Sequence, residues 1–124
     1  MAFSRKTKWI SITNTDEVKF IIVILTRGIE TLDGFQLVEN EIEATKDINI
    51  EDSTGNVSKY ETISIIEYQG SASSLGRSEG HYICDIKERS TKQWYRTNDN
   101  NNPIPIEAED VTKCGYVFLY RKLD

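Results

Sequence analysis

The sequence predicts a mainly antiparallel β structure of the α+β class, folded as a single domain over residues 1–124. Short apolar or alternating runs recur along the chain, and turn-forming clusters separate them. Helical periodicity is nearly absent and is confined to Glu107–Lys113, where one or two turns are expected. A chain of 124 residues with 38% hydrophobic content has room for one core. Strands at this spacing indicate a sandwich or a curled sheet.

The first half of the chain contains the clearest apolar strand signal. Trp9–Ile12 alternates weakly, whereas Val18–Leu25 is a mostly β-branched apolar run, interrupted by Lys19, of the length of a buried strand. Gly34 is expected at a turn. Further extended pieces and a turn cluster are predicted at Ile42, Ile48–Ile50 and Asp52–Asn56.

Strict alternation predicts the central strand, Tyr60–Tyr68. One face is expected to carry Tyr60, Thr62, Ser64, Ile66 and Tyr68, and the other face Ile63 and Ile65.

The second half is expected to contain a loop, a hairpin and a final strand. The small-residue stretch Gly70–Gly80 predicts a loop. Strands are predicted at His81–Lys87 and Gln93–Thr97, joined by the charged turn Glu88–Lys92. Tyr116–Arg121, rich in aromatic and β-branched residues, predicts the last strand.

The composition excludes several classes of partner and site. A net charge of −5 argues against nucleic acid as the main partner, and no apolar run approaches the length of a membrane span. The N-terminal MAFSRKTKW lacks the apolar region of a secretory signal, so a cytoplasmic or nuclear protein with free thiols is expected. One histidine and two cysteines, Cys84 and Cys114, form no metal-spaced set, so neither a metal nor another cofactor is predicted.

The single histidine, His81, lies in a setting that suits a general base. A histidine base needs one ring nitrogen held by a partner so that the other nitrogen can accept a proton. Asn98 follows the predicted hairpin, which would bring its amide toward His81 at one end of the sheet. Gly80 directly precedes His81 and leaves space beside it for a substrate chain.

Several motifs together resemble the C-terminal half of the catalytic domain of ubiquitin-specific proteases, which are papain-like deubiquitinating cysteine proteases. They are GHY at Gly80–Tyr82, W-Y-x-x-N-D at Trp94–Asp99 and YVFLYR at Tyr116–Arg121. Looser matches follow in the same order upstream, at Phe20–Gly28, Glu43–Ser53 and Tyr60–Gly70. The resemblance implies the palm-like part of that fold, covering about residues 8–122.

The resemblance also implies site residues and a partner. His81 matches the family's catalytic base, Asn98 its orienting residue, and Asp99 a supporting acid. Substrate contacts are implied at Gly80, Tyr82, Tyr68 and Trp94. The implied partner is ubiquitin or a ubiquitin-like protein.

The sequence departs from the family pattern in three side chains and lacks two of its parts. Tyr68 stands where the family commonly has His, Thr62 replaces an apolar residue, and Thr97 replaces an aromatic one. The family's nucleophile lies in a G-N-T-C-[YW] box, and neither this box nor the family's zinc fingers is found in the chain. Alternation places Cys84 on the strand face opposite His81, so Cys84 is not expected to replace the missing thiol.

Three hypotheses remain open. The chain can be a protease module that is inactive alone and that obtains its thiolate from a separate Cys-box-bearing segment. It can instead be an inactive pseudo-protease that binds ubiquitin or another protein, or an unrelated all-β interaction domain. A missing lobe should also leave exposed apolar surface.

Overall fold

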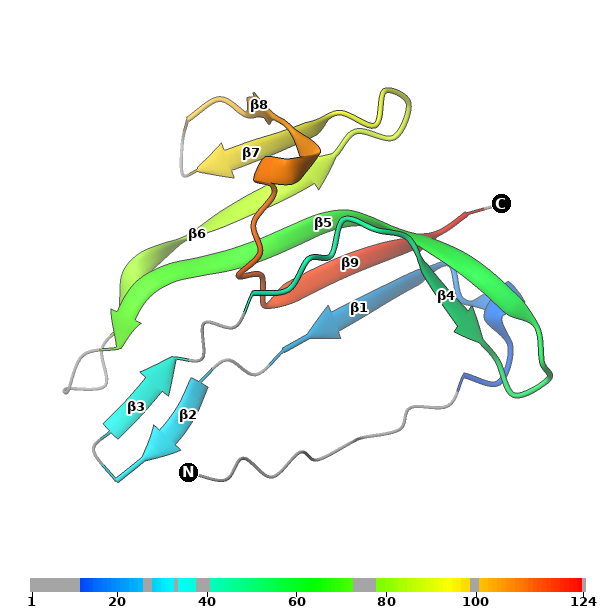
Figure 1. Cartoon of the computed structure of the whole chain (residues 1–124), viewed down its shortest axis with the longest axis horizontal. Helices are drawn as coiled ribbons and strands as arrows, with labels where there is room; N and C mark the ends of the chain where they lie inside the picture. Colours follow the sequence, from blue (N-terminus) through cyan, green and yellow to red (C-terminus); the bar gives the residue numbers. More distant parts are fainter. Residues whose placement is uncertain are drawn as a thin grey trace.

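A computed structural model describes residues 12–25, 28–32, 34–37, 41–72, 78–98 and 101–123. Its main sheet is antiparallel, in the order β1-β9-β5-β6-β7-β8, with β4 also paired to β5 (Figure 1). A separate hairpin pairs β2 with β3. The strands are β1 (Phe20–Ile24), β2 (Gly28–Thr31), β3 (Gly34–Leu37), β4 (Ile48–Glu51), β5 (Val57–Ala72), β6 (Ser78–Lys87), β7 (Trp94–Asn98), β8 (Ile104–Ile106) and β9 (Val117–Lys122).

The predicted fold class and most predicted elements are confirmed. The expected helical segment is a single 3-10 turn, η2 (Ala108–Asp110), and a second such turn, η1 (Thr15–Glu17), precedes β1. The predicted loop Gly70–Gly80 is too long, because β5 continues to Ala72 and β6 already begins at Ser78. Short β8 was not predicted, and the expected strand at Trp9–Ile12 lies largely outside the described residues.

The predicted face assignment of the central strand is wrong because β5 contains a bulge. Thr62 pairs with Tyr120 but Ser64 pairs with Leu119, so Ile63 is an extra residue. The bulge shifts the alternation by one residue. Tyr60 on one side of the bulge and Ile65 on the other therefore both lie in the core, each 0% exposed.

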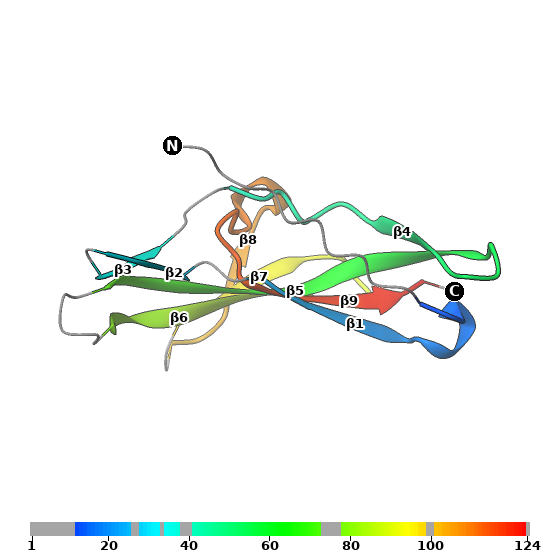
Figure 2. The same ribbon diagram turned by 90° about the horizontal axis from the view of Figure 1, so that it is seen from below.

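The core lies between one face of the sheet and the segments that cross it. Tyr60, Ile65, Trp94, Phe118 and Tyr120 form its centre, and Ala44 and Val111 close it from the covering segments. Figure 2 shows the chain leading into β4 and the β8–η2 connection on the same side of the sheet. Thr62 donates a hydrogen bond to the Ala44 carbonyl and fixes the first of these segments.

The turn between β4 and β5 is organised by one buried carboxylate, that of Asp52, as the turn cluster predicted. Asp52 accepts hydrogen bonds from Thr54, from the Asn56 amide and from both the amide and the hydroxyl of Thr15. Hydrogen bonds from Thr54, followed by that from the Thr15 amide, hold the pKa of Asp52 well below its ordinary value. Asp52 thereby ties η1 to the β4–β5 turn.

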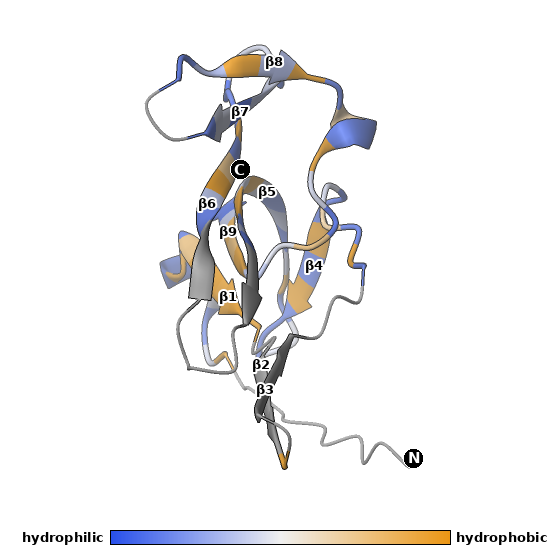
Figure 3. Cartoon of the chain, turned by 90° about the vertical axis from the view of Figure 1, so that its left-hand side faces the viewer, coloured by the Kyte–Doolittle hydropathy of each residue, from blue (hydrophilic) through white to orange (hydrophobic). Residues whose placement is uncertain are grey.

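The opposite face of the sheet exposes large apolar side chains on two of its strands, β1 and β6. They are Phe20, Ile22 and Ile24 of β1 and Tyr82 and Ile86 of β6, between 43% and 68% exposed. The apolar run in β1 predicted a strand buried on both faces. That prediction is wrong for this chain, because only the alternate residues of β1 pack on the core. In Figure 3 β1 is coloured hydrophobic along its length, whereas β4 alternates.

Candidate functional site

The β6–β7 hairpin places His81 and Asn98 on the same face of the sheet. Asn98 pairs directly with Ile83, and His81 lies two residues from Ile83 along β6. Residues two apart on a strand share a face, and so do paired residues on neighbouring strands. Asn98 is therefore the diagonal neighbour of His81 at the end of β7. Diagonal neighbours have Cβ atoms about 7 Å apart, within reach of longer side chains.

The two side chains are partly buried, and their orientation relative to one another stays a prediction. No side-chain hydrogen bond joins His81 to Asn98 within the residues that the structure describes. Hydrogen bonds between the polar groups of a site are often long without a ligand and tighten when the ligand binds. The third predicted member, Asp99, lies outside the described residues.

Gly80 directly precedes His81 on β6. It pairs with Gly70 across β5 and β6, so two residues without side chains face one another. His81 itself pairs with Gln69.

Tyr68 and Tyr82, both predicted substrate contacts, lie together on the face opposite His81. They pair across β5 and β6, with ring centroids 5.0 Å apart, and Tyr82 also meets Tyr116 at 6.1 Å. Burial, with a further contribution from Tyr82, raises the pKa of Tyr116. The hydroxyl of Tyr68 is buried and has no hydrogen-bond partner among the described residues. The predicted site residues are thus divided between two faces of β6.

Trp94 lies in the core and is 4% exposed. Its ring packs under Lys87, whose ammonium nitrogen is 5.8 Å from the ring centroid. These contacts anchor the start of β7. A substrate contact by Trp94 stays a prediction.

Cys84 lies on the face opposite His81, as alternation predicted. Its neighbours on β6, Ile83 and Asp85, are buried at 2% and 0% exposure, whereas Cys84 is only partly buried. The Cys84 thiol lies 3.2 Å from the hydroxyl of Ser64 on β5. This free thiol therefore cannot meet His81 without rebuilding β6.

A buried ion pair near the site was not predicted. Asp85 and Arg96 pair directly across β6 and β7, and Arg96 binds the Asp85 carboxylate with two hydrogen bonds. The sequence did contain a sign of this pair. Asp85 falls on the same alternation face as His81 and Ile83, and the hairpin places a basic residue, Arg96, directly across from it.

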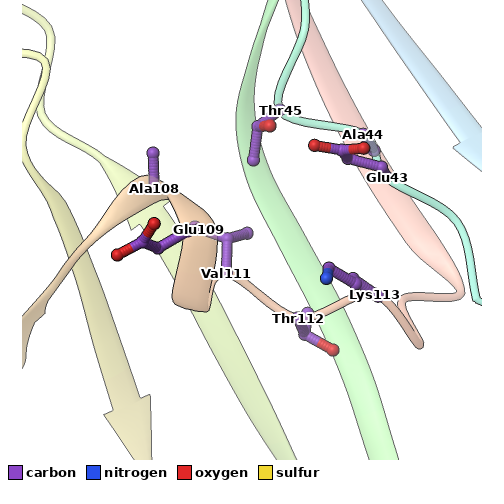
Figure 4. Close-up of a pocket in the computed structure, with 8 residues that line it drawn as sticks. All are labelled: Glu43, Ala44, Thr45, Ala108, Glu109, Val111, Thr112 and Lys113. Atoms are coloured by element: carbon purple, nitrogen blue, oxygen red, sulfur yellow. The ribbon is translucent and has the colours of Figure 1, made fainter.

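The described residues also form a small pocket of about 70 Å³. Figure 4 shows it between the segment before β4 and η2 with the residues that follow. Its lining includes Glu43, Glu109 and Lys113 and none of the predicted site residues. Within the described ranges, no three His, Cys, Asp or Glu side chains gather to hold a metal ion. No described helix is long and apolar enough to span a membrane.

A protein-family comparison matches residues 3–120 to the family described as ubiquitin carboxyl-terminal hydrolase. Among curated proteins, the human ubiquitin carboxyl-terminal hydrolase 37 is 33% identical over 92 residues, which are 71% of this chain and 9% of that protein. Ubiquitin hydrolase B of Dictyostelium discoideum is 32% identical over 63 residues, 51% of this chain and 13% of its own. The chain thus spans a small part of these relatives.

Solved structures give the same result at the level of the fold. A SAGA deubiquitinating module with Ubp8, Sgf11, Sus1 and Sgf73, bound to monoubiquitin, matches with a TM-score of 0.71 and 28% identity. The match covers 86% of this chain and 24% of the other chain. An essential yeast splicing factor shares the fold at a TM-score of 0.59 and 17% identity. The hypothesis of an unrelated all-β domain is wrong, because family and fold agree over most of the chain.

Proposed function

Since this chain belongs to the ubiquitin carboxyl-terminal hydrolase family, we propose that it is a deubiquitinase module that supplies the His and Asn of a cysteine-protease triad. The observation that carries the proposal is the β6–β7 register, which sets His81 and Asn98 on one face as diagonal neighbours. The single histidine of the chain is thereby next to an amide able to hold one ring nitrogen.

In the proposed reaction His81 takes the proton of a cysteine thiol, and Asn98 holds the imidazole in the working tautomer. The thiolate attacks the carbonyl of the C-terminal glycine of ubiquitin. The lysine amine leaves with the proton from His81, and water then hydrolyses the thioester, which restores the thiol. Gly80 and Gly70 leave a path for the thin glycine-rich tail.

The thiol would come from a separate Cys-box-bearing segment. One observation supports this division: the Cys84 thiol projects on the face opposite His81. By itself the chain is therefore expected not to cleave an isopeptide bond.

An inactive ubiquitin-binding module is the second candidate. The face of Cys84 favours it, because a chain without a thiol beside His81 can bind a ubiquitin tail but cannot form the thioester. A ubiquitin probe with an electrophile at its C-terminus should label neither Cys84 nor Cys114. Labelling of Cys84 would show that the face assignment does not hold in solution.

Titration of isotope-labelled ubiquitin with the chain tests binding in both candidates. We expect chemical-shift changes that include the C-terminal tail, with a dissociation constant of about 100 μM or weaker, because half a site lacks the contacts of the other lobe. Gly80→Trp should weaken these changes by filling the path beside His81. Arg89→Trp, in the exposed β6–β7 turn, is the control and should leave them unchanged.

Two results would contradict the proposal in different ways. Absence of any shift at millimolar protein would reject ubiquitin binding by this chain. Shifts that are the same in the Gly80→Trp variant would keep ubiquitin binding and reject the tail path. Activity of the chain alone on a fluorogenic ubiquitin substrate would reject the need for a second segment.

A further inference from the structure

Asp85 is a buried acid next to the proposed site to which the proposed reaction gives no role. Its side chain is fully buried, and it lies on the β6 face that carries His81 and Ile83. Its carboxylate accepts hydrogen bonds from Arg96 Nε at 2.9 Å, from a terminal nitrogen of Arg96 at 3.0 Å and from the Thr112 amide at 2.8 Å. One carboxylate therefore joins β6, β7 and the connection before β9.

Arg96 is held from a third direction as well. A terminal nitrogen of its guanidinium donates to the Asp110 carbonyl at 2.9 Å. The hydrogen bond to Asp85 raises the pKa of Arg96, so the guanidinium stays charged across the ordinary pH range. A two-bond fork of this kind fixes the geometry as well as the distance.

The pair occupies the position next to His81 and Asn98 in the hairpin. Asp85 is two residues from Ile83 on β6, and Arg96 is two residues from Asn98 on β7. The ion pair therefore lies on the same face of the sheet as His81 and Asn98. A slip of β7 by one residue would turn Arg96 to the other face and leave the Asp85 carboxylate buried without its cation, which is strongly unfavourable.

The Asp85–Arg96 pair thus opposes a one-residue slip of β7 away from the register that makes Asn98 the diagonal neighbour of His81. Trp94, which pairs with Lys87, fixes the far end of the same hairpin but lies two further residues from Asn98. From this geometry we infer that Asp85 is a positioning residue, which acts through Arg96 to hold Asn98 against His81. The inference rests on the proposed function of that pair.

Nuclear magnetic resonance of the full chain tests the inference without any activity assay. The readouts are the cross-strand contacts between the backbones of Ile83 and Asn98, and the ring nitrogen shifts of His81 at alkaline pH, which give the tautomer ratio of the neutral imidazole. Asp85→Asn keeps the shape of the side chain and removes its charge. Asp52→Asn is the matched control, because it alters another buried, hydrogen-bonded acid far along the chain.

In Asp85→Asn we expect the Ile83–Asn98 contacts to weaken and the tautomer ratio of His81 to fall about fivefold, the effect of losing one ordinary hydrogen bond. Asp52→Asn should change neither readout even if it lowers stability. Should Asp85→Asn fail to fold, Arg96→Lys gives the same comparison, because a lysine keeps the charge but cannot form the fork.

A folded Asp85→Asn or Arg96→Lys variant with the wild-type contacts and the wild-type tautomer ratio would overturn the inference. The variant Asn98→Ala separates this outcome from failure of the proposed function. If Asn98→Ala leaves the His81 tautomer ratio unchanged, Asn98 does not orient His81 and the proposed function is wrong. If Asn98→Ala lowers the ratio and the two variants of the ion pair do not, only the positioning role is wrong.

Discussion

At the scale of single residues, the least expected feature is the concentration of positive charge around Glu61. This glutamate is 2% exposed, although it lies in a strand that was predicted mainly from apolar alternation. Lys87, Lys92 and Arg121 approach its carboxylate at 2.8, 3.1 and 3.3 Å. Burial raises the pKa of Glu61, but hydrogen bonds and charge from Lys87 and Lys92 outweigh burial and lower the pKa to about 2.

The lowered pKa predicts an acid-dependent loss of stability. Because the folded state holds the Glu61 carboxylate charged, its contribution is complete above the ordinary pKa of 4.5 and is lost as pH falls toward about 2. Glu61→Gln should lower the free energy of unfolding at neutral pH by about 2 to 4 kcal/mol. It should also flatten the dependence of that free energy on pH between 4.5 and 2.

Urea denaturation at several pH values measures both effects, and Glu51→Gln, at an exposed position of β4, is the control. If Glu61→Gln left the pH dependence of the free energy of unfolding unchanged, the ionisation of Glu61 would not contribute to stability and the prediction would be wrong.

At the scale of elements, the bulge at Ile63 decides which side chains of β5 enter the core. In a regular strand Tyr60 and Ile65, which are five positions apart, would face opposite sides of the sheet, and the bulge lets both face inward. The sequence gives little sign of it, since Ile63 suits a regular strand as well as a bulge.

Deletion of Ile63 should therefore remove the bulge without turning either residue outward. The deletion leaves Tyr60 and Ile65 an even number of positions apart, so both still face the core, and we expect a loss of no more than about 1 to 2 kcal/mol in the free energy of unfolding. Ile63→Thr keeps both the residue count and the β-branch and should cost about 1 kcal/mol. Near-ultraviolet circular dichroism during urea denaturation compares the two. A loss of more than about 3 kcal/mol on deletion would show that the fold needs the bulge itself and not only the shared face of Tyr60 and Ile65.

At the scale of the whole molecule, the sheet has one covered face and one apolar face open to solvent. Strand β1 has apolar side chains on both of these faces. Ile21 and Val23 pack on the core, whereas Ile22 and Ile24 are 64% and 68% exposed. The same strand therefore contributes to the core on one face and exposes apolar side chains on the other.

The two faces of β1 should respond differently to the same change. Ile22→Thr with Ile24→Thr should alter the free energy of unfolding by no more than about 0.5 kcal/mol per site and should reduce binding of the dye ANS. Ile21→Thr with Val23→Thr, the matched pair on the same strand, should lower that free energy by about 1 to 3 kcal/mol per site. Urea denaturation and dye fluorescence give the comparison. Equal losses from the two pairs would show that both faces of β1 are covered in solution.

The sequence alone determined the local features of this protein. Alternation, turn clusters and strand spacing predicted the antiparallel sheet, the β6–β7 hairpin and the opposite faces of His81 and Cys84, because these depend on residues near one another in the chain. The tertiary structure decided what pairing between distant strands imposes: the bulge in β5, the one-sided burial of β1, and the burial of Glu61 and Asp85 beside their cations. The physical reason is that burial of a side chain depends on which strands and segments lie over it, and local periodicity carries no record of them.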